Sequence, residues 1–170
     1  MIGKPDKAKE ILQVVIYQNF LSMMQNLTAL LQLEISDPQA VKIIIERITC
    51  LADAFHAKQL HPSTMLAVYL NLAVVYAAQN DTANTLSALQ DYCDLAVGIS
   101  YPLSLHGDQF FNRIDAWLSE LNLGIHAPRD DKTIKQSILT GIAGNPAFAS
   151  LTDNLKYQHI VEKLTTVLGG

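Results

Sequence analysis

Few side chains in this sequence are spaced for catalysis. Asp91 and Asp94 lie one helical turn apart, so their carboxylates could form an acid–base pair. The same spacing is typical of acids on a solvated helix face, and that is the simpler explanation. The sequence has five histidines: His56, His61, His106, His126 and His159. No two of them stand at the i, i+4 spacing of a helical zinc site, and none lies beside a cysteine.

The sequence also lacks the motifs of common enzyme sites. It has no Gly-x-Ser-x-Gly turn for a nucleophilic serine and no glycine-rich phosphate loop. Cys50 and Cys93 form neither a disulfide framework nor a metal-binding spacing, so we expect two buried thiols. The sequence therefore predicts a protein that is not an enzyme, with no catalytic residue, no cofactor and no metal site.

The clearest candidates for binding are side-chain amides in residues 11–33, a stretch without a charged residue. The amides and one serine fall close to one helical stripe: Gln18, Asn19, Ser22, Gln25, Asn26 and Gln32. One interpretation is that this stripe packs beside another helix or subunit, where amides cost less to bury than charges. The other is that it lines a groove and hydrogen-bonds an extended peptide, because an amide both donates and accepts. The candidate ligand-binding residues are then Gln18, Asn19, Gln25, Asn26 and Asn71.

The same stretch also predicts association. Fifteen of its 23 residues are apolar, which is more surface than one neighbouring helix would cover. We expect a homodimer with Met24, Leu27 and Leu31 at a two-fold interface. The stretch is long enough to span a membrane, but six amides in hydrocarbon would be costly. We therefore expect no membrane contact and a cytoplasmic protein.

Composition narrows the possible partners. Charged residues make up only 16% of the chain and hydrophobic residues 49%, and the formal net charge is −4. This excludes intrinsic disorder, which combines low hydrophobicity with high net charge. It also excludes a chain that binds DNA by bulk electrostatics, because such binding needs a basic surplus.

Helical periodicity dominates the chain, and prolines mark most of its breaks. The pattern predicts helices over residues 5–32, 38–57, 61–79, 81–97, 108–121, 131–143 and 155–168, with an extended connection over 98–107 and a loop over 122–129. We expect Phe110, Phe111 and Trp117 to point inward from the helix over 108–121. The predicted fold class is all-α, as one domain over 1–170. It has antiparallel helical hairpins over 5–97 and a helical extension over 98–170.

Residues 66–97 are similar to a tetratricopeptide repeat, a helix pair with a 34-residue period. Aromatic, leucine, small and aromatic residues stand in the order of that repeat at Tyr69, Leu72, Ala73 and Tyr76. Thr85 and Val97 depart from it, where the repeat usually has alanine and proline. The similarity implies a right-handed helical array, although a generic helical hairpin would fit the pattern nearly as well.

Longer segments resemble the C-terminal part of bacterial, mainly Firmicutes-type, helix-turn-helix transcriptional regulators. They are residues 101–111 with 114–117, 123–124 through 127–130 with 134–137, 145–151, and 157–164. The resemblance implies a tetratricopeptide-like region that follows a DNA-binding domain, senses a signal and sets dimer geometry. Residues 1–60 are net neutral and hold no basic recognition helix. DNA is therefore expected only through a DNA-binding domain absent from this chain.

Two functions remain open as hypotheses. The first is a ligand- or peptide-sensing and dimerisation module of a transcriptional regulator, with a peptide or small-molecule effector. The second is a free-standing helical-repeat scaffold that mediates protein–protein interaction. On either hypothesis, the chain itself is not expected to bind duplex DNA specifically.

Overall fold

The computed structural model describes residues 3–101, 103–121 and 131–169, with side chains from residue 5 onward. These residues form helices and turns with no strand among them, so the predicted all-α fold class is confirmed. The predicted loop over 122–129 lies outside the described residues. The elements are α1 (Gly3–Leu33), α2 (Pro38–Ala54), α3 (Ala57–Leu60), α4 (Pro62–Ala78), α5 (Thr82–Gly98), α6 (Asp115–Glu120), α7 (Asp131–Ile142), the 3-10 helix η1 (Pro146–Leu151) and α8 (Leu155–Leu168).

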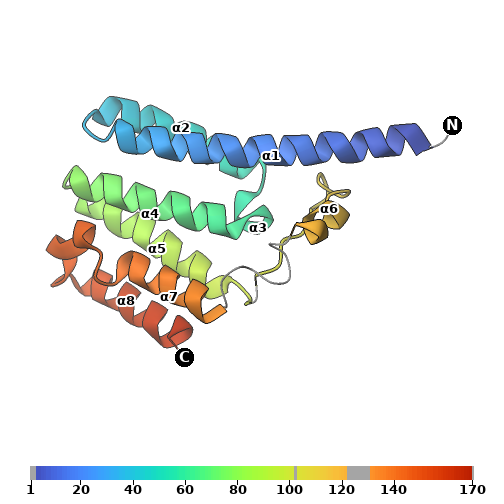
Figure 1. Cartoon of the computed structure of the whole chain (residues 1–170). Coiled ribbons are helices and arrows are strands. Elements are labelled where there is room, and N and C mark those ends of the chain that lie inside the picture. Colours follow the sequence, from blue (N-terminus) through green and yellow to red (C-terminus); the bar gives the residue numbers. More distant parts are fainter. Residues whose placement is uncertain (1–2, 102, 122–130, 170) are drawn as a thin grey trace.

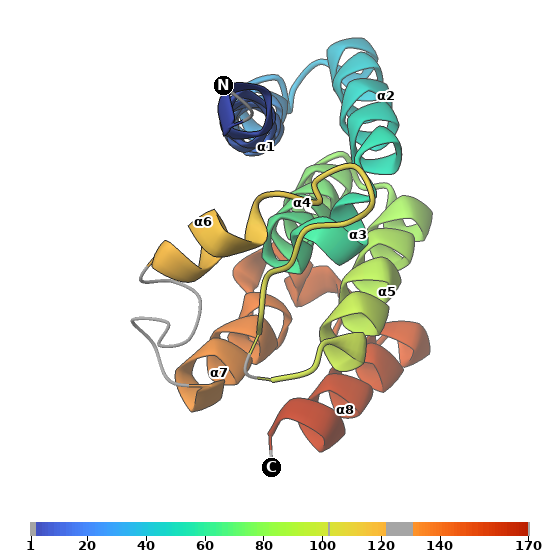
Figure 2. The same ribbon diagram turned by 90° about the vertical axis from the view of Figure 1, so that its right-hand side faces the viewer.

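Three pairs of helices follow one another along the chain. α1 packs on α2, α4 on α5 and α7 on α8, and each pair is an antiparallel hairpin (Figure 1). α1 also contacts α4, and α5 contacts α8, which joins successive hairpins. Seen end-on, α1, α4 and α7 follow one side of the molecule, whereas α2, α5 and α8 follow the other (Figure 2).

Side-chain caps explain where two of these helices begin. The Asp37 carboxylate accepts hydrogen bonds from the N–H groups of Gln39 and Ala40 at 2.9 and 3.1 Å. Asp81 accepts from the N–H of Asn84 at 3.1 Å, and this bond holds the pKa of Asp81 below its ordinary value. Each bond satisfies an N–H group that lacks an intrahelical partner in the first turn.

Residues 108–114 do not form the helix predicted there. The Asp108 carboxylate accepts hydrogen bonds from the N–H groups of Phe110 and Phe111, both at 2.8 Å. This local turn competes with helix formation, and α6 begins only at Asp115. Phe111 is buried as predicted, but Phe110 is 57% exposed, so its predicted inward position is wrong.

One face of α1 is part of the core. Tyr17, Phe20, Met24 and Leu31 are buried within the chain, where α1 packs on α2 and α4. Met24 and Leu31 are 0% exposed, so the prediction that they lie at a dimer interface is wrong. Leu27 is half-buried against the same core. The sequence pattern did not identify this face because apolar residues occur on more than one side of α1.

Buried hydroxyl groups connect α5 and α8 to α7. The Tyr92 hydroxyl on α5 donates to the carbonyl oxygen of Ile138 at 2.9 Å. The Tyr157 hydroxyl on α8 donates to the carbonyl oxygen of Ile142 at 3.0 Å. Burial raises the pKa of both phenols, so both remain protonated donors at neutral pH.

Two further expectations concern the thiols and the membrane. Cys93 is buried as predicted, but Cys50 is exposed on α2, so its predicted burial is wrong. Across the described ranges, no helix combines the length and the apolar character that crossing a membrane requires.

Candidate functional site

A groove between α1 and α4 gathers uncharged polar side chains, and we call it the amide groove. Its volume is about 460 Å³, within the range of small-ligand sites. Its lining residues are Met24, Gln25, Thr28, Ala29, Gln32, His61, Ser63, Thr64, Ala67 and Asn71. None of these ten is an aspartate, glutamate, lysine or arginine, so the groove is electrically neutral whenever His61 is neutral.

Hydrogen bonds occupy some of these polar atoms and leave others for a ligand. The Gln32 Nε2 donates across the groove to the carbonyl oxygen of Asn71 at 3.3 Å. The Asn71 Nδ2 donates to the carbonyl oxygen of Ala67 at 2.7 Å, which leaves its Oδ1 as an acceptor. Within the part of the chain that the structure describes, the Gln25 side chain forms no hydrogen bond. Its amide can therefore donate and accept at once.

His61 stands at the start of α4 and lines the amide groove. Its Nδ1 accepts a hydrogen bond from the N–H of Thr64 at 3.2 Å, so the neutral ring carries its proton on Nε2. Burial lowers the pKa of His61. The ring centroids of Tyr17 and His61 lie 6.3 Å apart. The Tyr17 hydroxyl is buried without a hydrogen-bond partner among the described residues, and burial raises its pKa to about 12.

We expect His61 to make the fold less stable in mild acid. The unfolded imidazole gains a proton near pH 6.5, whereas the folded one does so only at lower pH. The unfolded chain binds more protons between these values, so the free energy of unfolding falls as the pH drops from about 6.5 through the folded pKa. His61→Asn keeps a capping acceptor for Thr64 but does not titrate. In urea unfolding at about pH 7.5 and about pH 5, the variant should lose less stability than the wild type; an equal loss would contradict this.

The structure brings together two of the five predicted ligand-binding residues. Gln25 and Asn71 both line the amide groove, one from each helix. Gln18, Asn19 and Asn26 are exposed on α1 and do not line it. Gln18 lies on the same side of α1 as Gln25 but before Met24, where the lining of the groove begins, whereas Asn19 and Asn26 lie on another side of the helix.

Sequence reasoning missed Thr28, His61 and Thr64, which line the same groove. A signal for the first was present, because residues 25, 28 and 32 share one face of α1 at steps of three and four. Residues 64, 67 and 71 have the same spacing on α4. What the sequence did not reveal is that these two faces lie opposite each other.

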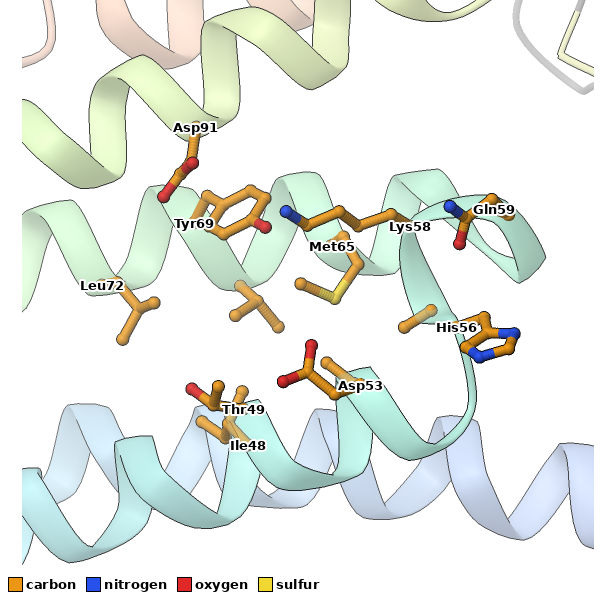
Figure 3. Close-up of a pocket in the computed structure, with 13 residues that line it drawn as sticks. Ile48, Thr49, Asp53, His56, Lys58, Gln59, Met65, Tyr69, Leu72 and Asp91 are labelled. Atoms are coloured by element: carbon orange, nitrogen blue, oxygen red, sulfur yellow. The ribbon is translucent and has the colours of Figure 1, made fainter.

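A second cavity of about 490 Å³ is lined by residues of α2, α3, α4 and α5, among them Asp53, Lys58 and Asp91, and we call it the charged pocket (Figure 3). Lys58 points toward Tyr69 in this pocket, with its Nζ 5.6 Å from the centroid of the ring. A hydrogen bond to Tyr69, followed by the charges of Asp91 and Asp53, raises the pKa of Lys58. The ammonium group therefore already has partners within the chain.

Asp91 and Asp94, which the sequence suggested as an acid–base pair, have different surroundings. Asp91 lines the charged pocket, whereas Asp94 accepts a hydrogen bond from Lys163 at 2.7 Å. In the described ranges, no three side chains of histidine, cysteine, aspartate or glutamate lie close enough together to hold a metal ion. We therefore take the amide groove, where amide atoms are still available for a ligand, as the candidate binding site in preference to the charged pocket.

No protein-family model, no curated protein and no solved structure matches this chain. What the chain does is therefore inferred from its own cavities and surfaces.

Proposed function

We propose that this chain is a non-catalytic module that binds a short, uncharged peptide in the amide groove. The observation behind the proposal is the lining of the groove. Two facing helices present hydrogen-bonding side chains there without formal charge, and Gln25 and the Asn71 Oδ1 are still available.

A peptide backbone fits this chemistry better than a charged ligand does. Each peptide bond needs one donor and one acceptor, which the Gln25 amide supplies by itself. Ala29 and Ala67 are the smallest side chains of the lining, and they allow an extended backbone to approach both helices closely. A charged side chain would lose hydration in the groove and gain no opposite charge.

In a regulator of the kind that the sequence resembles, this module would read the signal. A peptide lying between α1 and α4 contacts two successive hairpins, so binding would favour one angle between them. The DNA would be contacted by a separate domain, and the module itself would transmit the signal in the cytoplasm. A right-handed, tetratricopeptide-like arrangement of the hairpins belongs to the same proposal.

The alternative is a scaffold that binds a folded protein partner. Phe110 favours it, because this ring is 57% exposed beside a cavity of about 500 Å³ that Phe55 and Phe111 also line. Exposed aromatic side chains beside pockets are frequent anchors of protein interfaces. A scaffold of this kind would lose binding on Phe110→Ala and keep it when the amide groove is altered.

We expect Gln25→Ala combined with Asn71→Ala to weaken peptide binding about tenfold or more. Each lost hydrogen bond between neutral groups costs about 0.5–1.5 kcal/mol, and three are removed, two at the Gln25 amide and one at the Asn71 Oδ1. The probe is a panel of fluorescein-labelled, uncharged hexapeptides, and the readout is fluorescence anisotropy. Asn19→Ala combined with Asn26→Ala removes two amides from the same helix outside the groove and should leave affinity unchanged. The proposal is wrong if no peptide of the panel binds, or if both double variants bind equally well.

A further inference from the structure

α1 carries a second apolar face that no described part of the chain covers. Seven exposed residues follow each other along it in alternating steps of four and three: Leu12, Ile16, Asn19, Met23, Asn26, Leu30 and Leu33. We call this set the outer stripe. Its apolar members range from 37% exposed at Ile16 to 80% at Leu33. Steps of four and three are the heptad spacing of helices that pair side by side.

The outer stripe is separate from the faces already described. The core face of α1 is formed by Tyr17, Phe20, Met24 and Leu31. The amide groove uses Gln25 and its neighbours on another side of the helix. Figure 2 shows α1 end-on at the edge of the molecule, with α2 and α4 on its inner side. A helix could therefore pack along the stripe without displacing any element of this chain.

The absence of charge on the stripe suits a second copy of the same chain. Two identical charged faces repel each other, whereas an amide pairs with an identical amide because it donates and accepts. From Ile11 to Leu33 the helix has no charged residue. Lys9, one step before the stripe, marks the point where this uncharged surface begins.

The positions of the two asparagines select the direction of pairing. Asn19 and Asn26 are seven residues apart and occupy the same heptad position. In a parallel, in-register pair each stripe residue meets its own counterpart, so amide meets amide at both levels. In an antiparallel pair, by contrast, residues at one core position of the heptad lie opposite residues at the other core position. Each asparagine would then face an apolar residue such as Met23.

We propose that two copies of this chain associate through the outer stripe, with their α1 helices parallel and in register about a two-fold axis. Asn19 and Asn26 fix the register, since a slip by one heptad would leave one amide against an apolar residue. The stripe from Leu12 to Leu33 gives a contact about 32 Å long at 1.5 Å per residue. The proposal does not depend on the amide groove.

Disulfide trapping tests this proposal in the full chain. Cys50→Ser removes the exposed thiol and leaves Cys93 buried. In that background, Asn19→Cys and Asn26→Cys should each give covalent dimers on mild oxidation, because in-register positions lie within disulfide reach. Gln18→Cys places an equally exposed thiol beside the stripe and should give only background cross-linking. Circular dichroism checks that all three variants fold.

Each result decides the proposal. Self-linked dimers of Asn19→Cys and of Asn26→Cys, with a dimer mass by light scattering for the wild type, support it. Cross-linking only in a mixture of the two variants would show a parallel pair slipped by one heptad, and a dimer mass without cross-linking would rule out the parallel, in-register pair; either result would overturn the register. A monomeric wild type at micromolar concentration without cross-linking would overturn the dimer, and the peptide-binding measurement would be unaffected.

Discussion

Replacing Phe111 with alanine should lower the free energy of unfolding by about 3–5 kcal/mol. The same replacement at Phe110 should cost about 1 kcal/mol or less. Phe111 is 1% exposed, and its ring lies 5.6 Å from Tyr17 and 6.0 Å from Phe55 between ring centroids. Truncation would leave a cavity where α1, the end of α2 and the chain before α6 meet. Phe110 is mostly exposed, so its removal leaves no comparable void.

The Phe110→Ala variant is the control for Phe111→Ala. Both variants remove a phenyl ring, and they do so at adjacent positions. The effects of the two substitutions on the unfolded chain should therefore be nearly equal. The measurement is urea unfolding followed by circular dichroism at a fixed protein concentration, with the slope against denaturant compared among the three proteins. Equal losses for the two variants, or a loss below about 1 kcal/mol for Phe111→Ala, would show that this ring cluster does not hold the segment in place.

The sequence predicted most of the helices because their ends are chemically marked. Asp37 followed by a proline starts α2, and Asp81 starts α5 through a capping bond. The helix predicted over 108–121 was wrong for most of its length, since the Asp108 carboxylate bonds two N–H groups in a turn instead of capping a helix. An aspartate can either cap a helix or stabilise a turn, so only the structure shows which of the two Asp108 does.

The candidate site was only partly predictable. Of the predicted amides, Gln25 and Asn71 line one groove, whereas Gln18, Asn19 and Asn26 lie outside it. The dimer residues were placed on the wrong face because α1 has apolar residues both toward the core and on the outer stripe. Helical periodicity identifies a single apolar face readily. When a helix has two apolar faces, periodicity does not show which of them packs on the core. The contacts of α1 with α2 and α4 decide between them.

Met24→Lys should strongly destabilise the fold, whereas Met23→Lys should leave its stability nearly unchanged. Met24 is 0% exposed, so a lysine there places an unpaired ammonium group in the core. We expect a loss of at least about 3 kcal/mol, as for other uncompensated buried charges. Met23 is 49% exposed on the outer stripe, and a lysine there keeps its charge in water within a single chain.

The two substitutions therefore separate the core face of α1 from its proposed interface. Thermal unfolding followed by circular dichroism should show a large fall in midpoint for Met24→Lys and a small one for Met23→Lys. Light scattering of Met23→Lys should give the monomer mass, because a parallel dimer would place two ammonium groups against each other at that level. If Met24→Lys instead keeps its stability and becomes monomeric, the core face assigned to α1 is wrong. If Met23→Lys unfolds the chain, the outer stripe is part of the core rather than a surface.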